Sequence, residues 1–170
     1  GRRVSRERLV IVTAEVGIAS GAVSDLDACQ QVAVAFCELL DAGDTAQAFE
    51  LHSTDLAFFP PGAPAPLGRD AARAGAEGMR HAYEGRRTLH VLGNFIGRVV
   101  SADRVEAQYV VTVYELTRNV DGRAEERDVP VVFALAHERV VFAREEGRWR
   151  YLEQRMVPIA PRDPFAGGRS

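Results

Sequence analysis

The chain has 170 residues, 46% of them hydrophobic and 26% charged, and carries a formal net charge of −3. These are the values of an ordinary globular chain of single-domain length. They argue against nucleic-acid binding, which needs a basic field, and no apolar run approaches the ~20 residues of a membrane span. We therefore expect a soluble, cytoplasmic protein without nucleic-acid or membrane partners.

The two cysteines also favour a reducing compartment such as the cytoplasm. Cys29 and Cys37 lie in one expected helix, at a separation of about 12 Å that is too large for a disulfide. We interpret both as buried small hydrophobic residues of a reducing compartment. No spacing of Cys and His indicates a metal site, and the apolar run at 9–12 is shorter than the hydrophobic region of a signal peptide.

Helical periodicity begins at Asp25, after an N-terminal extension of residues 1–24. Apolar residues then recur at three- and four-residue steps and predict one buried helical stripe. Ser24 or Asp25 is the expected N-cap, and Gly43 is the expected C-terminal stop. A second, short helix is predicted from residue 45 to about residue 53. The stripe of the first helix consists of Cys29, Val32, Ala33, Phe36, Cys37 and Leu40.

A short strand and a loop follow the second helix. Residues 56–59 predict the strand, and the proline-rich segment 60–68 can form neither a helix nor a central strand. We expect this segment to be a loop and a candidate lid over a binding site. A third helix is predicted from residue 69 to about residue 83.

Everything after residue 86 is strand-like. Short turn segments separate the runs, so consecutive strands must be antiparallel. Because the helices precede the long strands instead of alternating with them, the predicted fold class is α+β. The domain is predicted to span residues 25–160, with a mobile or partner-wrapping tail at 161–170. The predicted long strands are 87–100, 104–118, 129–146 and 148–159.

The length of these strands predicts a pocket. Strands of roughly 14 to 18 residues would run to about 45 Å or more, and sheets of this length coil strongly. Helices packed on the concave side then leave a conical cavity, and such cavities are the usual sites for small ligands.

Asp41 is the first candidate for chemistry. It lies one helical turn after Cys37, so it continues the apolar stripe at a helix end where the macrodipole disfavours an anion. A carboxylate in that position requires a partner. The alternative is that the helix simply ends here and that Asp41 turns into water.

His90 is the second candidate. Both faces of its strand are apolar, so His90 is expected to be buried or half-buried and to need a hydrogen-bond partner, for which a carboxylate is natural. A satisfied core histidine is the alternative. Asn94 is a candidate binding residue, because strand alternation predicts that it lies on the same face as His90. That face is predicted to carry His90, Leu92, Asn94 and Ile96, and the other face Leu89, Val91 and Phe95.

Two further strand residues are pocket candidates. Tyr109 lies among apolar neighbours, and its phenol could donate a hydrogen bond to a substrate carbonyl, although core packing is the alternative. His137, in phase with Leu135 and Val141, is a candidate binding residue. Apolar lining of the pocket is predicted from Phe59, Met79 and Tyr83.

The other face of so apolar a sheet predicts a homodimer that covers it. Its predicted members are Val110, Val132, Val140 and Phe142.

Four segments resemble, in their order, the SnoaL-like branch of the NTF2-like superfamily, near scytalone dehydratase and the bile-acid dehydratases. They are residues 36–44 (FCELLDAGD), 68–71 (GRDA), 88–94 (TLHVLGN) and 147–155 (GRWRYLEQR). The resemblance covers about residues 26–158. It implies an NTF2-like (cystatin-like) cone, in which three helices pack on a strongly curved antiparallel sheet and enclose a pocket.

In the dehydratases of this family a helix-end Asp pairs with a strand His that faces the cavity, and Asp41 and His90 match these positions. A second cavity His corresponds to Tyr109, and the tyrosine before the family's Asp corresponds to Leu40. The resemblance implies that His90 is a general base oriented by Asp41, with Tyr109 at the enolate oxygen. It also implies dehydration, isomerisation or cyclisation of a small, mostly apolar carbonyl compound, without a metal or organic cofactor.

A non-catalytic role is the alternative. The β subunits of ring-hydroxylating dioxygenases resemble this pattern and serve in assembly, and a ligand-binding module is also open. The Ala- and Arg-rich composition suggests a GC-rich bacterial source and, by association, polyketide metabolism. The sequence leaves the substrate and the choice among these reactions open.

Overall fold

The computed structural model describes residues 24–82, 87–118 and 128–159, which contain three helices and one five-stranded sheet. The helices are α1 (Asp25–Asp41), α2 (Thr45–Glu50) and α3 (Arg69–Ala82). The strands are β1 (His52–Phe59), β2 (Arg87–Ser101), β3 (Arg104–Arg118), β4 (Asp128–Glu145) and β5 (Arg148–Pro158). The predicted α+β class is confirmed, as are the four long strands.

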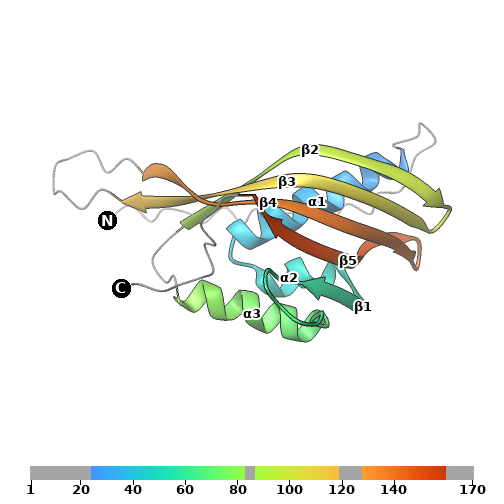
Figure 1. Ribbon diagram of the computed structural model, residues 1–170, viewed down its shortest axis with the longest axis horizontal. Helices are drawn as coiled ribbons and strands as arrows, with labels where there is room; N and C mark the ends of the chain where they lie inside the picture. The colour runs from blue at the N-terminus through green and yellow to red at the C-terminus, as the bar shows by residue number, and fades with distance from the viewer. Residues whose placement is uncertain (1–23, 83–86, 119–127, 160–170) are drawn as a thin grey trace, which may run out of the picture.

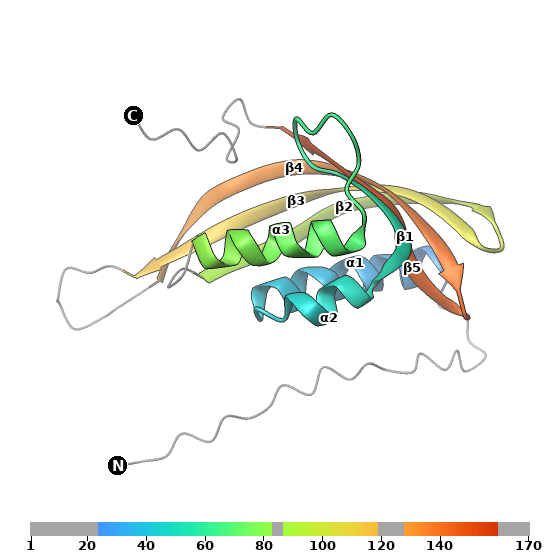
Figure 2. The same ribbon diagram turned by 90° about the horizontal axis from the view of Figure 1, so that it is seen from below.

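The sheet order is β1-β5-β4-β3-β2, antiparallel from β2 to β5, with β1 added parallel to β5. The sheet arches over the helices, which lie on its concave side (Figures 1 and 2). α1 packs against β2, β3 and β5, whereas α3 packs against β1 and α2. The core lies between α1 and the sheet, where Phe142 and Tyr151 are fully buried.

α1 begins and ends where the sequence predicts. The Ser24 hydroxyl accepts a hydrogen bond from the Asp27 N–H at 3.2 Å, and the Asp27 carboxylate accepts one from the Ser24 N–H at 3.1 Å. These two bonds form a capping box. Gly43 follows the helix with a φ of 77°, which favours glycine. Between these ends four residues of the apolar stripe are buried and two, Val32 and Leu40, are partly buried, and the helix packs along β2.

The predicted second helix is too long at its C-terminal end. α2 ends at Glu50, and His52 begins β1. His52 pairs with Tyr151 of β5, and its ring stacks on Phe49 and Tyr151 at centroid distances of 4.9 and 4.7 Å. Strand pairing and ring stacking outweigh helical spacing here, because so short a helix has little stability of its own.

A β-bulge in β2 corrects the predicted faces of this strand. Between two paired positions β2 carries one residue more than β3. Asn94 adopts a φ of 53° in the bulge and is exposed. Beyond it the alternation reverses, so Phe95 packs against the core, and Ile96, predicted on the face of His90, is 63% exposed. Period-two patterning assumes an unbroken pleat and cannot register an inserted residue.

The inner face of β4 is the opposite of the predicted one. Val140 and Phe142, predicted on the dimer face, are buried in the core, and Glu138 shares their face. His137, predicted in the pocket, is exposed on the outer face, and Val132 is exposed as predicted. Both faces of this strand carry apolar residues, so alternation groups them without indicating which group faces the helices.

Gly97 marks a close approach of α1 to β2. A Cβ at this position would lie 2.9 Å from Leu26 Cδ2 and 3.1 Å from both the Ala107 Cβ and the Glu106 carbonyl oxygen. We expect Gly97→Ala to lower the free energy of unfolding by about 1–3 kcal/mol, because overpacking forces the helix and strand apart. Urea denaturation measures this change. Gly93→Ala is the matched control, since a Cβ there meets nothing within 4 Å, and equal stability of the two variants would contradict the prediction.

Candidate functional site

Asp41 and His90 form a hydrogen-bonded pair between the end of α1 and β2. The Asp41 Oδ1 accepts a hydrogen bond from the His90 Nδ1–H at 2.6 Å, and its Oδ2 accepts one from the His90 backbone N–H at 2.7 Å. The Thr88 hydroxyl donates a third bond to Oδ1 at 3.3 Å. The structure thus brings the two predicted partners together and adds Thr88, which sequence reasoning missed.

The place of β2 in the sheet explains this contact. β2 is an edge strand, and an edge strand leaves a row of N–H groups without a strand partner. Asp41, at the last position of α1, reaches one of them, because α1 packs along β2. Thr88 and His90 are two residues apart, so their side chains project to the same face and converge on this carboxylate.

The pair leaves the second imidazole nitrogen available for chemistry. Because Nδ1 donates to a carboxylate, the proton lies on Nδ1 and the lone pair on Nε2. Among the described residues the structure gives His90 Nε2 no partner. The Asp41 and His90 side chains are each 18% exposed, so they are largely desolvated but still reachable. This is the arrangement of a general base oriented by a carboxylate.

Tyr109 lies deeper than the pair, in the core. It faces the helices as predicted, and it is only 2% exposed. Its hydroxyl shares a 2.9 Å hydrogen bond with that of Tyr151, and its ring stacks on Phe95. Burial raises the pKa of both phenols well above the ordinary value, so both stay neutral. Among the described residues no hydrogen bond or ring contact joins Tyr109 to His90 directly.

Phe59 lies at a different edge of the molecule. It ends β1, and the Arg155 guanidinium lies over its ring at 3.7 Å. Phe59 borders an open hollow of about 390 Å³ between the proline-rich loop and the end of β5. Three of the remaining predicted binding residues are exposed: Met79 on α3 at 45%, Asn94 in the bulge of β2, and His137 on the outer face of β4. Tyr83 lies outside the described residues.

Sequence reasoning also missed a chain of buried polar side chains across β1, β5 and β4. The His52 Nε2–H donates to Gln154 Oε1 at 3.0 Å, and the Gln154 amide donates to Glu138 Oε2 at 3.4 Å. All three side chains are buried, Glu138 to 2% exposure. Tyr109 of β3 lies directly opposite Glu138 of β4. This series of hydrogen-bonded side chains therefore ends in the same deep part of the interior as Tyr109.

Burial favours the neutral form of both titratable side chains in this hydrogen-bonded series, His52 and Glu138. Burial raises the pKa of the Glu138 carboxyl to about 8, against the opposing effect of the Gln154 hydrogen bond. Burial also lowers the pKa of the His52 imidazole to about 4. A sequence signal for Glu138 existed, because it lies in phase with Val140 and Phe142 and is a carboxyl within an apolar run.

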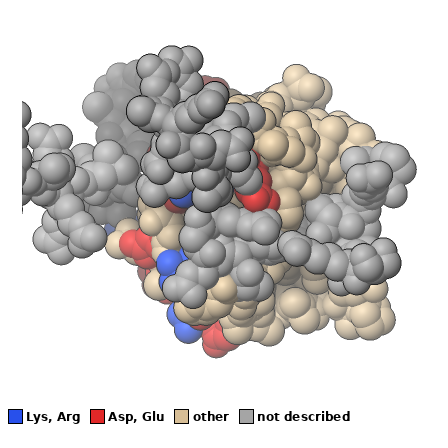
Figure 3. All heavy atoms as spheres, turned by 90° about the vertical axis from the view of Figure 1, so that its left-hand side faces the viewer, with Lys and Arg blue, Asp and Glu red and all other residues tan. Residues whose placement is uncertain are grey.

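The described residues offer little support for other chemistry. Both cysteines are free and buried, and burial raises the pKa of each thiol to about 12, which leaves them unreactive. Within the described part of the chain no group of His, Cys, Asp and Glu side chains could hold a metal ion. None of the described helices is long and apolar enough to span a membrane. Acidic and basic side chains intermingle on the side shown in Figure 3.

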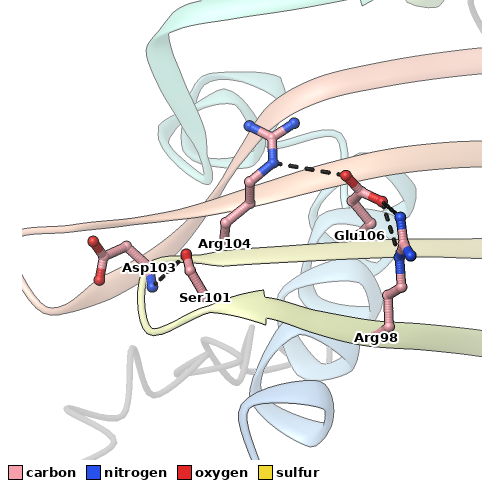
Figure 4. A network of polar contacts seen from close by, with 5 residues as sticks. All are labelled: Arg98, Ser101, Asp103, Arg104 and Glu106. Carbon is pink, nitrogen blue, oxygen red and sulfur yellow. Dashed lines mark hydrogen bonds and ion pairs between the residues drawn. The ribbon is translucent and has the colours of Figure 1, made fainter.

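The outer face of the sheet carries exposed ion pairs. The Glu106 carboxylate contacts Arg98 at 2.7 Å and Arg104 at 3.8 Å (Figure 4). Arg98 and Glu106 border an open hollow of about 410 Å³ that crosses β2 to β5. The hydrogen bonds from Arg98 lower the pKa of the Glu106 carboxyl. Exposed pairs of this kind add little stability, so Glu106 is a natural contrast to the buried Glu138.

The structure thus shows an α+β fold in which an aspartate and a histidine are hydrogen-bonded between the end of α1 and the edge strand β2. A profile of the SnoaL-like domain matches residues 21–155. The chain therefore belongs to the SnoaL-like domain family, and the resemblance to this family seen in the sequence is confirmed. No curated protein sequence matches the chain.

Solved structures show the same fold at low sequence identity. Aln2 from a Streptomyces species is 16% identical with a TM-score of 0.68, over 77% of this chain and 88% of that one. An NTF2-like protein with a cystatin-like fold from Novosphingobium aromaticivorans is 22% identical, with a TM-score of 0.64 over 82% and 84%. A provisionally assigned scytalone dehydratase from the same organism is 16% identical, with a TM-score of 0.63 over 78% and 83%.

The buried hydrogen-bonded series His52–Gln154–Glu138 predicts an unusual dependence of stability on pH. From pH 4.5 to about 8 the unfolded chain loses the Glu138 proton while the folded chain keeps it, so stability falls as pH rises. From about pH 4 to 6.5 the His52 imidazole is protonated in the unfolded protein but neutral in the folded protein, so stability rises with pH. The two slopes, each about 1.4 kcal/mol per pH unit, oppose each other where they overlap. Above pH 6.5 only the Glu138 slope remains, and the expected loss by pH 8 is about 2 kcal/mol.

Urea denaturation at fixed pH values tests this prediction. Glu138→Gln should abolish the loss between pH 6.5 and 8, and should uncover the rise between pH 4 and 6.5. Glu153→Gln, which changes a half-exposed carboxyl on the outer face of β5, should retain the loss. An alkaline loss of the same size in Glu138→Gln would assign it to another group.

Proposed function

We propose that the protein is a cofactor-independent dehydratase, isomerase or cyclase that acts on a small, mostly apolar carbonyl compound. The observation that carries this proposal is the Asp41–His90 hydrogen bond of 2.6 Å, with the imidazole Nε2 left without a partner among the described residues. A proton on Nδ1 and a lone pair on Nε2 are what abstraction of a carbon-bound proton requires. A provisionally assigned scytalone dehydratase with this fold supports the same class of reaction.

The proposed reaction starts with the removal of a proton α to the substrate carbonyl. His90 Nε2 takes the proton, the C–H electron pair moves to the carbonyl oxygen, and an enolate forms. Asp41 stabilises the imidazolium and keeps its ring in place through the bond to Nδ1. In a dehydration the enolate then expels a β-hydroxyl group, which leaves as water after it receives the proton from Nε2. In an isomerisation or cyclisation the proton returns to another carbon.

The surroundings of the pair favour an apolar substrate. Leu40 precedes Asp41, and Leu92 lies two residues beyond His90 on the same strand face. Both are partly buried against the core, as is Val113 of β3, which pairs with His90 of β2. A planar or ring-shaped carbonyl compound suits such walls, and polyketide-derived rings are the class that we propose. Catalysis by a histidine and a carboxylate needs no electron carrier.

Exchange of α-protons with D2O tests the first step without knowledge of the natural substrate. Ring-fused β-hydroxyketones are incubated with the protein, and loss of the α-proton signal is followed by 1H NMR. His90→Gln should reduce the rate by about 10²–10⁴-fold, the usual contribution of a general base. Asp41→Asn should reduce it less, because the base remains but its orientation and charge partner are lost.

His137→Gln is the matched control, since it makes the same change at an exposed histidine on the outer face of β4. It should leave the exchange rate unchanged. Equal rates for His90→Gln and His137→Gln, or no acceleration by the natural chain over buffer, would favour the alternative of a non-catalytic binding or assembly subunit. Circular dichroism of each variant separates lost chemistry from lost folding.

Homodimerisation through the outer face of the sheet remains part of the proposal. Among its predicted members, Val132 is 56% exposed and Val110 half-buried, and the exposed Val91 and Ile96 lie on the neighbouring edge strand β2. Exposed apolar side chains grouped on one face favour a partner of the same kind.

A further inference from the structure

We propose that the hollow between the proline-rich loop and the end of β5 is a second binding site, which takes a small aromatic carboxylate. Arg155 binds the carboxylate group, and the apolar side chains around it hold the ring. The hollow lies at the β1 edge of the sheet, whereas the Asp41–His90 pair lies at the β2 edge. The inference therefore goes beyond the proposed function and does not depend on it.

The hollow exists because β1 ends before β5 does. Phe59, the last residue of β1, pairs with Arg155, and beyond this point β5 continues to Pro158 with β4 on one side. The chain after Phe59 turns away into the loop that leads to α3, beside the end of β5 (Figure 2). Because β1 has ended, side chains from both faces of β5 border the hollow. Its volume of about 390 Å³ is within the usual range for small-molecule sites.

The loop wall of this hollow is a turn that the sequence specifies. The Ala63 N–H donates a hydrogen bond to the Pro60 carbonyl oxygen at 3.2 Å, and Gly62 has a φ of 74°. Proline at the second position and glycine at the third are typical of a type II turn. Phe58 and Leu67 join the two ends of the loop through backbone hydrogen bonds of 2.9 and 2.7 Å. The wall is thus formed without a ligand, which lowers the entropic cost of binding.

Arg155 supplies the positive charge at the hollow. Its guanidinium lies over the Phe59 ring at 3.7 Å, and stacking of this kind leaves the N–H groups in the guanidinium plane open to an acceptor. The Glu153 Oε1 lies 4.0 Å away, at the outer limit of an ion pair, and the Arg155 side chain is 43% exposed. The planar fork of donors is therefore oriented but not saturated, and it matches the two oxygens of a carboxylate.

A second arginine makes this place more favourable for an anion. Arg139 of β4 pairs directly with Arg155 of β5 and is exposed. Among the described residues no hydrogen bond or ion pair engages the Arg139 side chain. Like charges directly opposite each other in a sheet repel. A bound carboxylate therefore relieves a repulsion that is present in the free protein.

The rest of the lining determines the class of the anion. Pro60, Pro61, Met156 and Val157 offer apolar surface, and Arg155 is the one charged residue among the described lining residues. A small anion without an apolar body leaves this surface in water. A flat ring covers it, and the methionine sulfur makes favourable contacts with aromatic rings. An aromatic carboxylate therefore suits both the guanidinium and the apolar walls.

Calorimetric titration with 2-naphthoate, a two-ring carboxylate, tests the inference. The natural chain should bind it, and Arg155→Gln should bind it about tenfold more weakly, because a charge-assisted pair of hydrogen bonds is lost. Arg155→Lys should restore part of the affinity, since an ammonium keeps the charge but not the planar fork. Naphthalene-2-carboxamide, the neutral counterpart, should bind the natural chain about tenfold more weakly than the acid. Arg98→Gln, which changes an exposed arginine on the outer face (Figure 4), should bind 2-naphthoate as the natural chain does.

The methionine methyl groups locate the bound acid. The chain has two methionines: Met156 borders the hollow, whereas Met79 lies on α3 and is 45% exposed. In protein labelled with 13C at the methionine methyl groups, 2-naphthoate should shift the Met156 signal and leave the Met79 signal in place. Met79→Leu assigns the two signals. This measurement uses the natural chain, so it decides the question even if Arg155→Gln does not fold.

The inference is overturned by any of several results. They are no binding by the natural chain, equal affinity of Arg155→Gln and Arg98→Gln, equal affinity for the acid and its carboxamide, or a Met156 signal that ignores the ligand. His90→Gln should lose α-proton exchange but bind 2-naphthoate with the affinity of the natural chain. A failure of the proposed base and a failure of this second site are therefore distinguishable.

Discussion

The carboxylate of Asp41 joins the end of a helix to the free edge of a sheet, and the arrangement of the candidate site depends on it. Its two oxygens accept hydrogen bonds from the His90 ring, the His90 backbone and Thr88. The backbone bond fixes the strand, and the ring bond fixes the tautomer of the imidazole. One side chain therefore holds both the strand and the imidazole ring, and these hydrogen bonds offset the unfavourable position of an acid at the C-terminal end of α1.

The interior has two polar regions of opposite chemical character. At the more open region the Asp41 carboxylate holds the ring of His90, which we propose as the base. At the deeper region burial raises the pKa of the Glu138 carboxyl, which accepts a hydrogen bond from Gln154, and Gln154 in turn accepts one from His52. Apolar side chains fill the space between, and this low-polarity surrounding strengthens the electrostatic effect of both regions.

Sequence patterns predicted the element order, the α+β class and the ends of α1, because helical and strand periods are local. They also indicated that Asp41 and His90 each need a partner, whereas the family resemblance implied that the two residues pair with each other. The patterns failed where one residue changes the phase or where both faces of a strand are apolar. The inserted residue at Asn94 reversed the faces of β2, and the apolar outer face of β4 placed His137 inside and Val140 outside. His52 was assigned to a helix because its strand partner, Tyr151, is far away in the sequence. Glu138 could have been found by the argument that identified Asp41.

The position of β5 in the sheet has a consequence for how the chain folds. β5 lies between β1 and β4, so the last described strand is an inner strand of the sheet. The first strand, β1, can join the sheet only after β5 has formed. Until β5 arrives, β1 has no neighbour, and the rings that stack around His52 lack Tyr151. Pairing across such a sequence separation is slow because loop closure must precede any gain in contacts. During synthesis, the aromatic residues of the first half therefore remain uncovered until the ribosome has released the C-terminal strand, and that interval is when the chain is most prone to aggregate.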